Sequence, residues 1–377
     1  MEVPVGEREL SERLSQLDGL ARVREAAMSD AVYLVGGAVR DLLMGRSRVD
    51  VDVAVEGDVG ALCRRLGEVA ALNERFRTAT VRVGGLQVDL AETRAETYAS
   101  PGALPEVRPA PLRDDLARRD FAINAMALPL AGPARLVDPF DGRGDLEREL
   151  IRVLHPRSFV DDPTRALRAA RYSARLGFAL EEETARLVRA TDLGTVSADR
   201  VDAELERLGA EERAVEALAL LSEWGLVSVE ADDLALAGVV AGLASSSPWQ
   251  GFVERRRAIL AAALGDARAA ADPRTPAREL AASGPDRPSE ALSLTRGRDP
   301  VELALARAIG AEWLDRWVAE WRHVALEIGG EELLAAGVPQ GPAIGRGLDA
   351  ALRRKLDGEI EGREAELQAA LAEARRS

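Results

Sequence analysis

Lysine, cysteine and histidine are nearly missing from this chain of 377 residues. Lys355 is the only lysine, Cys63 the only cysteine, and His155 and His323 are the only histidines. A single cysteine excludes an internal disulfide and a cysteine-rich zinc site, and two histidines are too few for a histidine-rich metal site. A covalent lysine mechanism would have to use Lys355. Because nearly all positive charge is arginine, any phosphate-binding site must be built from guanidinium groups.

Long hydrophobic runs and an excess of positive charge are missing as well. The longest apolar run, at 234–244, is too short to cross a bilayer, and the N-terminal stretch MEVPVGEREL lacks the apolar core of a signal peptide. The 50 Lys and Arg residues against 64 Asp and Glu residues leave a net charge of −14. This balance argues against loose, charge-driven binding of nucleic acid, but it is compatible with a local basic groove. We expect a cytoplasmic protein without membrane contacts.

The periodicity of apolar residues divides the chain into a mixed part and a helical part. The mixed part is predicted to contain helices within 1–30 and at 38–44 and 59–71, and strands at 32–35, 50–55, 80–83 and 86–90. Prolines and glycines at 93–117 disfavour regular structure, 118–128 has helical spacing, and the pattern is helical from about 147 onward. The sequence therefore predicts an α+β fold, with a small mixed sheet and its helices followed by an all-helical part.

Two aspartates in a predicted strand carry the clearest chemical signal. Asp50 and Asp52 point to the same face of a strand, where two like charges are unfavourable unless a cation neutralises them. Hard oxygen ligands of this kind suit Mg²⁺. The turn at Gly36 and Gly37 allows the backbone to approach a polyphosphate, and Arg40 adds a donor one helical turn later. This combination predicts metal-assisted nucleotidyl transfer; the alternative is a turn beside a solvated edge strand.

The segment DDPTR could read a nucleotide base. Asp162 and Arg165 are three residues apart at a predicted helix start, so both could face one ligand. A carboxylate accepts from an exocyclic amino group and a guanidinium donates to a ring nitrogen, a pattern that cytosine and adenine present and that uracil and guanine do not. The alternative for Asp162 is helix capping. Arg168 and Arg171 continue a basic stripe, which would meet phosphates or pair with nearby acids.

Four segments, in this order, resemble class II tRNA nucleotidyltransferases, which comprise the bacterial CCA-adding, A-adding and CC-adding enzymes and poly(A) polymerases. The segments are VYLVGGAVRDLLMGRSRVDVDVAV, LARRDFAINAMAL, LVDPFDGRGDLERELIRVL and DDPTRALRAARYSARLGF, and 329–360 resembles the tail of the same group. The resemblance implies a polymerase-β-like head at 1–145, a neck at 146–210 that recognises the base, and a helical body and tail at 211–377. The body and tail would hold the acceptor and TΨC arms of tRNA.

The resemblance also implies a two-metal reaction on ATP and CTP. Asp50 and Asp52 would hold two Mg²⁺ ions, the 3′-hydroxyl of an RNA would attack the α-phosphorus, and pyrophosphate would leave. Gly36, Gly37 and Arg40 would cradle the triphosphate. We name Asp89 as the candidate third carboxylate and Glu92 as the alternative, although either could be a surface residue.

The remaining site residues follow from two family motifs. The RRDxxINA motif, which in the family lies against the sugar and phosphates, corresponds to Arg118, Arg119, Asp120 and Asn124. Asp120 and Asn124 are four residues apart and could grip one ligand; the alternative is a capping aspartate and a buried amide. Asp162 and Arg165 correspond to the protein template of the family, whose commoner form begins with Glu where this chain has Asp161. Arg168 and Arg171 are expected beside the nucleotide.

Three functions remain open from the sequence. The first is addition of CCA, or of its terminal A, to tRNA; the long segment 93–117 disfavours CC addition alone, because CC-adding enzymes have a shortened loop there. The second is a poly(A) polymerase, which the mixed C-terminus disfavours because those enzymes usually carry a basic tail. The third is a catalytically silent RNA-binding protein, which the joint presence of these motifs disfavours. The sequence does not give the oligomeric state.

Overall fold

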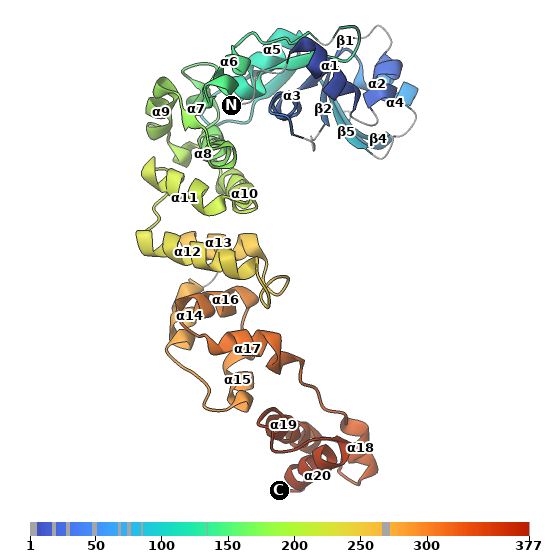
Figure 1. The fold of residues 1–377 in the computed structure, drawn as a ribbon, viewed down its shortest axis with the longest axis vertical. Coiled ribbons are helices and arrows are strands. Elements are labelled where there is room, and N and C mark those ends of the chain that lie inside the picture. The colour runs from blue at the N-terminus through green and yellow to red at the C-terminus, as the bar shows by residue number, and fades with distance from the viewer. Residues whose placement is uncertain are drawn as a thin grey trace. The chain divides into compact units, whose positions relative to one another are not determined.

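The computed structural model describes residues 6–16, 20–27, 31–46, 51–66, 69–73, 77–83, 86–133, 135–265 and 272–376. Asp50 lies outside these ranges, so its role stays a prediction. The chain folds into two compact units (Figure 1), which are Met1–Glu204 with Glu223–Leu226 and Leu205–Ser222 with Val227–Ser377. The division into 1–145, 146–210 and 211–377 is finer than these two units and also stays a prediction.

A six-stranded sheet lies at the centre of the first unit, with the strand order β3-β4-β5-β2-β1-β8. Its strands are β1 (Ala31–Val35), β2 (Val51–Glu56), β3 (Val69–Asn73), β4 (Thr78–Val83), β5 (Leu86–Glu92) and β8 (Ala127–Pro129). β2 and β5 run parallel, whereas every other pair of neighbours is antiparallel. The two strands on which the predicted carboxylates Asp52 and Asp89 lie are therefore direct neighbours.

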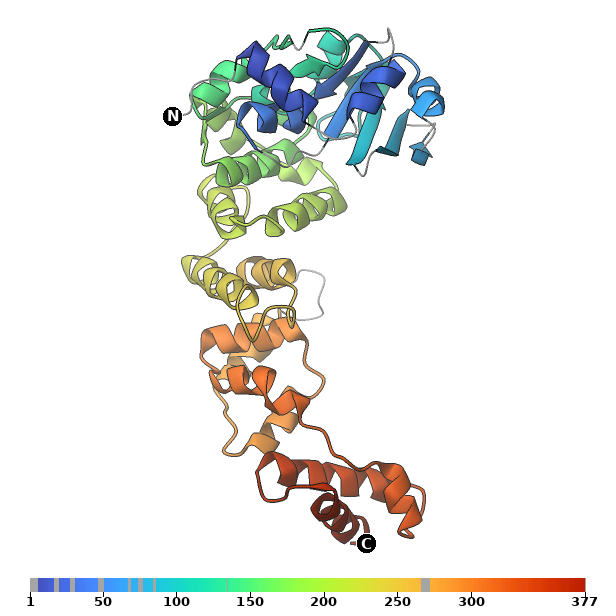
Figure 2. The ribbon, with the colours of Figure 1, turned by 45° about the vertical axis from the view of Figure 1, so that its right-hand side comes forward.

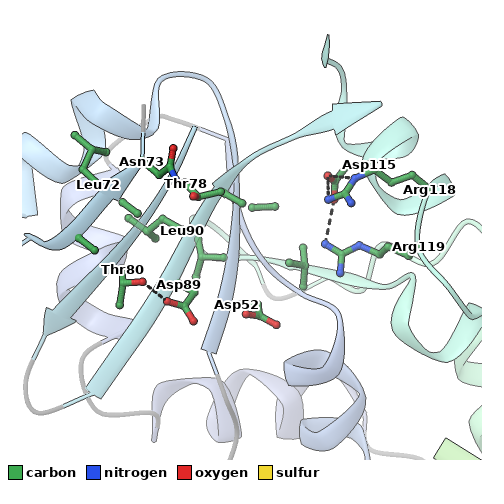
Figure 3. Close-up of a pocket in the computed structure, with 16 residues that line it drawn as sticks. Asp52, Leu72, Asn73, Thr78, Thr80, Asp89, Leu90, Asp115, Arg118 and Arg119 are labelled. Carbon is green, nitrogen blue, oxygen red and sulfur yellow. Dashed lines mark hydrogen bonds and ion pairs between the residues drawn. The ribbon is translucent and has the colours of Figure 1, made fainter. Parts of the chain in front are cut away.

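Helices cover one face of this sheet and leave part of the other face open. The covering helices are α1 (Glu7–Ser15), α2 (Leu20–Ala27), α3 (Gly37–Leu43) and α4 (Val59–Leu66). Successive side chains of a strand alternate between the faces, so Val53 and Leu90 are buried in the core beneath these helices. Asp52 and Asp89 are exposed on the opposite face (Figure 3).

The segment 93–117 has more regular structure than the sequence predicts. It forms an antiparallel hairpin of β6 (Arg94–Thr97) and β7 (Glu106–Pro109), followed by α5 (Leu112–Ala117). The prolines are compatible with this hairpin because a two-stranded ribbon has free edges, and Pro109 lies in its last residue pair. The expectation of an irregular segment was wrong for these residues.

Two predicted helices also differ from the structure. The helix expected at 59–71 ends at Leu66, and β3 begins at Val69. The helix expected at 118–128 is replaced by a 3₁₀ turn at Ala122–Asn124 and by β8. Residues 120–128 are all buried, so their apolar spacing does not distinguish a buried strand from a helix.

The rest of the first unit is helical around two short parallel strands, β9 (Leu150–Ile151) and β10 (Ala179–Leu180). Its helices are α6 (Gly142–Glu147), α7 (Ser158–Asp161), α8 (Thr164–Leu176), α9 (Glu182–Arg189) and the start of α10 (Ala198–Gly209), with a 3₁₀ turn at Leu193–Thr195. Helix α8 carries Arg165 and Arg168 toward the residues that precede β8.

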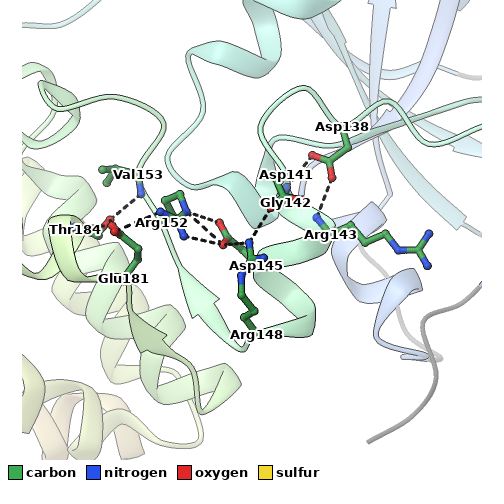
Figure 4. Close-up of polar contacts among 10 residues, drawn as sticks. All are labelled: Asp138, Asp141, Gly142, Arg143, Asp145, Arg148, Arg152, Val153, Glu181 and Thr184. Carbon is green, nitrogen blue, oxygen red and sulfur yellow. Dashed lines mark hydrogen bonds and ion pairs between the residues drawn. The ribbon is translucent and has the colours of Figure 1, made fainter.

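A buried carboxylate joins α6 to the strands and helices that follow it (Figure 4). Asp145 has no exposed surface and accepts hydrogen bonds from Arg148 Nη2 and Arg152 Nε, both at 3.0 Å. Arg152 also lies 3.3 Å from Glu181, whose carboxylate caps α9 by accepting from the backbone N–H of Thr184 at 3.0 Å. Because a buried charge requires partners, this network fixes the positions of α6, β9 and α9 relative to one another.

The second unit is built from helices (Figure 2). After the end of α10 these are α11 (Ala214–Glu223), α12 (Ala231–Ala244), α13 (Arg255–Leu264), α14 (Arg274–Ala281), α15 (Pro288–Thr295), α16 (Pro300–Ile309), α17 (Trp313–Ala319), α18 (Gly330–Ala335), α19 (Pro342–Leu356) and α20 (Arg363–Ala374), with a 3₁₀ turn at Trp321–His323. Lys355 donates to the buried carboxylate of Glu366 at 2.6 Å, which links α19 to α20.

The arrangement of one mixed sheet and many helices confirms the predicted α+β fold. Among the described residues, no helix combines the length and the apolar character needed to cross a membrane.

The network around Asp145 leads to a stability prediction. Asp145→Ala should lower the free energy of unfolding by about 2–4 kcal/mol, because it removes charge-assisted hydrogen bonds and leaves two guanidinium groups without their common acceptor. Glu147→Ala on the same helix is the matched control, because its pair with Arg143 is exposed and should contribute less than about 1 kcal/mol. Urea unfolding at neutral pH measures both. Equal effects of the two substitutions would contradict the role assigned to Asp145.

Candidate active site

Two carboxylates lie side by side on the open face of the sheet (Figure 3). β2 and β5 are parallel neighbours, and their register pairs Asp52 directly with Asp89. Both side chains are exposed on the same face. The alternative third carboxylate, Glu92, lies at the end of β5 and forms an ion pair with Arg77 at 2.8 Å. The geometry thus brings Asp89, rather than Glu92, next to Asp52.

The carboxylate pair lines a pocket of about 580 Å³. β2, β4 and β5 contribute one side of this pocket, and Asp115, Arg118 and Arg119 lie on the opposite side (Figure 3). Negative charge therefore faces positive charge across a space large enough for a small molecule. Such an arrangement can hold a cation on one side and the phosphates of a ligand on the other.

The carboxylates fit a divalent cation such as Mg²⁺. This ion commonly binds through one or two carboxylates, with its remaining ligands supplied by water and substrate phosphates. Asp52 and Asp89 offer two hard oxygen donors on one face. No cluster of three or more His, Cys, Asp or Glu side chains suited to a metal occurs among the described residues, and the predicted ligand Asp50 lies outside them. With Asp52 and Asp89 as its protein ligands, a cation would keep coordination positions free for substrate oxygens.

A buried aspartate orients the two arginines of the pocket. Asp115 on α5 is 1 % exposed, and it accepts hydrogen bonds from Arg118 Nη2 at 2.8 Å and Arg119 Nη2 at 3.0 Å. Burial raises the pKa of Asp115, but the charges of both arginines outweigh this effect and hold its pKa below the usual value. Asp115 was not predicted from the sequence, although its spacing of three and four residues from the two arginines is typical of ion pairs along a helix.

The glycine turn brings the backbone close to one of these arginines. Gly36 has a positive φ of 68°, and a Cβ atom there would lie 2.6 Å from Arg119 Nη1. Glycine is therefore needed both for the backbone conformation and for the close approach. Gly37, which follows it, begins α3. The lining of the described pocket includes neither glycine, so their predicted contact with a triphosphate stays a prediction.

Four predicted site residues from three segments form one chain of hydrogen bonds. Arg40 donates to Asn124 Oδ1 at 2.7 Å, Asn124 donates to Asp120 Oδ1 at 2.9 Å, and Arg168 donates to Asp120 Oδ2 at 2.5 and 2.9 Å. Arg40, Asp120 and Asn124 are buried. Asp120 and Asn124 are thus in contact, as their spacing indicated, although no α-helix holds them there. Whether a nucleotide is their common ligand stays a prediction.

Arg165 is a buried cation, and the groups that accept its hydrogen bonds are all neutral. It is 5 % exposed and donates to Ser158 Oγ at 2.8 Å, to the backbone carbonyl of Arg118 at 2.7 Å and to the Tyr98 hydroxyl at 3.4 Å. None of the described carboxylates forms an ion pair with it. Buried charges are usually paired, so an unpaired guanidinium beside the pocket arginines is a candidate ligand-binding group.

Tyr98 and Glu96, which were not predicted from the sequence, extend the hydrogen-bond network of Arg165. Burial raises the pKa of Tyr98 to about 12, although the charge of Arg165 acts in the opposite direction. Its hydroxyl therefore stays protonated and donates to Glu96 at 2.9 Å, and Glu96 in turn accepts from Arg118 Nη1 at 2.8 Å. The hairpin β6–β7 thus connects Arg165 to Arg118 through side chains.

Asp162 makes helix-capping contacts, and capping is the alternative role that the sequence predicts for it. Its Oδ1 atom accepts from the backbone N–H of Thr164 at 3.1 Å, from the Thr164 hydroxyl at 2.6 Å and from Arg200 Nη2 at 2.8 Å. The backbone N–H of Arg165 donates to the carbonyl oxygen of Asp162 at 3.1 Å, but among the described residues no hydrogen bond or ion pair joins their side chains. Because Oδ2 takes part in none of these bonds, capping and base recognition are compatible.

Arg168 and Arg171 pair with nearby acids, which is the alternative role that the sequence predicts for them. Besides Asp120, Arg168 lies 3.7 Å from Glu204, and Arg171 lies 3.9 Å from the same carboxylate. The Tyr172 ring lies within 4.9 Å of the Arg171 guanidinium. These ion pairs fix α8 against α10, and contact with a nucleotide stays a prediction for both arginines.

The chain resembles known proteins over most of its length. The family model described as "Poly A polymerase head domain" matches residues 32–152. An A-adding tRNA nucleotidyltransferase of Halalkalibacterium halodurans is 47% identical over 190 residues, which are 47% of this chain and 44% of that protein. A CC-adding tRNA nucleotidyltransferase of Deinococcus radiodurans is 33% identical over 86% of this chain and 84% of its own length. A CCA-adding enzyme of Geobacillus stearothermophilus is 31% identical over 92% and 93%.

Solved structures show the same likeness. The Thermotoga maritima CCA-adding enzyme complexed with tRNA matches with a TM-score of 0.74 and 27% identity, over 96% of this chain and 98% of that one. A CCA-adding enzyme in complex with ATP matches with a TM-score of 0.78 and 26% identity over the same shares. The chain spans less than half the length of the A-adding relatives, at 44%, 20% and 45% of the three proteins compared.

The Asp120–Arg168 pair predicts a pH-dependent contribution to stability. Burial raises the pKa of Asp120, but the Arg168 charge and the hydrogen bonds lower it to about 2 from the usual 3.8. A group whose pKa is lower in the folded state than in the unfolded state stabilises the fold at pH values above its unfolded-state pKa. This contribution disappears as the pH falls toward 2. Asp120→Asn should therefore cost on the order of 2 kcal/mol at pH 7 and progressively less below pH 4.

Denaturant unfolding of both proteins between pH 7 and pH 3 measures this difference. The exposed residue Asp114, on α5, supplies the control Asp114→Asn, which should change the free energy of unfolding by less than about 0.5 kcal/mol at pH 7. A cost of Asp120→Asn that stays constant over the whole pH range would contradict the charge-based account of this pair.

Proposed function

Because the chain belongs to the family of tRNA nucleotidyltransferases and poly(A) polymerases, we propose that it adds CCA, or its terminal A, to the 3′ end of tRNA. CTP and ATP would be the substrates, and pyrophosphate would be released. The pocket in which Asp52 and Asp89 face Arg118 and Arg119 is the observation that carries this proposal. Relatives named for CCA, CC and A addition, and solved complexes of CCA-adding enzymes with ATP, CTP and tRNA, support it.

The carboxylate side of the pocket would hold two Mg²⁺ ions. Asp52, Asp89 and the predicted ligand Asp50 would supply the protein oxygens, and Asp89 is the third carboxylate in this proposal because of its register with Asp52. When bound, such ions lower the pKa of an attacking hydroxyl and offset the charge of a triphosphate. The carboxylates would fix the geometry in which the RNA 3′-hydroxyl approaches the α-phosphorus in line with the leaving pyrophosphate.

The guanidinium side of the pocket would bind the triphosphate. Arg118 and Arg119 can each present a fork of donors to phosphate oxygens, and Asp115 fixes their orientation before the nucleotide arrives. Such preorganised positive charge lowers the barrier, because negative charge on the phosphates shifts during the transfer. Gly36 and Gly37 would contact the same phosphates through the backbone. Arg40, being buried, would act by holding Asn124 in place.

The neck would select the base without a nucleic-acid template. Arg165 would donate to a ring nitrogen, and Asp162 Oδ2 would accept from the exocyclic amino group of cytosine or adenine. Uracil and guanine would leave both protein groups unsatisfied, which costs more than a lost contact alone. Asp120 and Asn124, with Arg168 and Arg171 behind them, would hold the sugar and phosphates. The body and tail at 211–377 would hold the acceptor and TΨC arms of tRNA.

Three RNAs test this function: a tRNA that ends at the discriminator base, a tRNA that ends in CC, and an unstructured RNA. Each receives Mg²⁺ with CTP, ATP or both, and gels size the products. We expect three additions to the first RNA, or one A on the second RNA alone, and no product from UTP or GTP. Long tails on the unstructured RNA would identify a poly(A) polymerase, and no product on any RNA would favour the silent RNA-binding protein.

A further inference from the structure

Three polar side chains form a row across neighbouring strands of the open sheet face. The register of β4 and β5 pairs Thr80 with Asp89, and the register of β5 and β2 pairs Asp89 with Asp52. All three residues line the pocket (Figure 3). Asp89 therefore has the proposed metal ligand Asp52 on one side and a hydroxyl group on the other.

The hydroxyl of Thr80 is committed to this carboxylate. Thr80 Oγ1 donates to Asp89 Oδ1 at 2.7 Å (Figure 3). A hydroxyl has a single proton to donate, so this bond sets the rotation of the hydroxyl and favours one orientation of the carboxylate. Valine has the same shape and a similar preference for strands, so strand formation alone gives no reason for a hydroxyl here.

We propose that Thr80 is a positioning residue that holds Asp89 in the orientation needed to bind a divalent cation beside Asp52. The terminal torsion of an aspartate is broad, so an exposed carboxylate without such a bond samples many orientations. Hydrogen-bond partners of metal ligands typically change metal affinity or activity by about 10–100-fold when they are removed. This inference rests on the proposed function, because it deepens the assignment of Asp89 as a metal ligand.

The neighbouring threonine on the same strand provides a matched comparison. Thr78 lies two residues before Thr80, on the same face of β4, and its register partner on β5 is Ala91. Among the described residues, no carboxylate forms a hydrogen bond with its side chain. Removal of the Thr78 hydroxyl therefore changes the polarity of the same sheet face without touching Asp89.

The test compares T80V, T80S and T78V with the unmodified chain. Binding of Mn²⁺ to the protein without RNA or nucleotide is measured by electron paramagnetic resonance, with D89N defining the binding that does not involve this site. Initial rates of nucleotide addition to tRNA are then measured as a function of Mg²⁺ concentration, and thermal unfolding shows that each variant is folded.

We expect T80V to weaken Mn²⁺ binding at this site about tenfold and to raise the Mg²⁺ concentration for half-maximal rate by a similar factor. T80S, which keeps the hydroxyl, should stay within about twofold of the unmodified chain, and T78V should keep its Mn²⁺ affinity. Unchanged Mn²⁺ affinity in folded T80V, or an equal loss in T78V, would overturn the role of Thr80. An unmodified chain that binds Mn²⁺ normally but adds no nucleotide to tRNA would instead contradict the proposed function.

Discussion

Two arginine side chains hold helix α8 against the segment 118–124, and the rest of the site depends on their contacts. Arg165 donates to the backbone carbonyl of Arg118, and Arg168 donates to the buried carboxylate of Asp120. Both acceptors belong to the segment that also supplies the pocket arginines. The proposed base-reading group and the proposed phosphate-binding groups are therefore positioned by the same few hydrogen bonds. Since a buried charge without partners is costly, any shift of α8 would be resisted by both contacts.

A chain with one lysine uses the geometry of arginine throughout this region. Three buried carboxylates in the first unit each bind or approach two guanidinium groups: Asp115 with Arg118 and Arg119, Asp145 with Arg148 and Arg152, and Glu204 with Arg168 and Arg171. A planar guanidinium can bind an acid with some of its five donors and keep the others for a ligand. The ammonium group of lysine, a compact point charge, would not fix the same orientation. The scarcity of lysine is thus compatible with a precise phosphate site in an acidic protein.

Local sequence patterns predict the properties of single residues better than the contacts between distant segments. Alternation along a strand predicts that Asp50 and Asp52 share a face, but the register that sets Asp89 beside Asp52 depends on β5 pairing with β2 across the 29 residues 57–85, which local patterns do not contain. Asp115 and Tyr98 were missed because their roles arise from contacts between separate segments. The helix predicted from the apolar spacing of 118–128 is wrong because residues 120–128 are all buried, so this spacing does not mark one face of a helix. Asp50, which carried much of the first hypothesis, lies outside the described residues.

We propose that the side chains of Asp162 and Arg165 select the nucleotide, and a substitution of Arg165 tests this proposal most directly. Specificity constants for ATP, CTP, UTP and GTP, measured on tRNA with Arg165→Ala, give the discrimination ratio. The account predicts that preference for ATP and CTP over UTP and GTP falls at least tenfold, while Arg175→Ala, an exposed arginine at the end of the same helix, leaves the ratio unchanged. A folded Arg165→Ala protein that still rejects UTP and GTP as strongly as the unmodified chain would contradict the account.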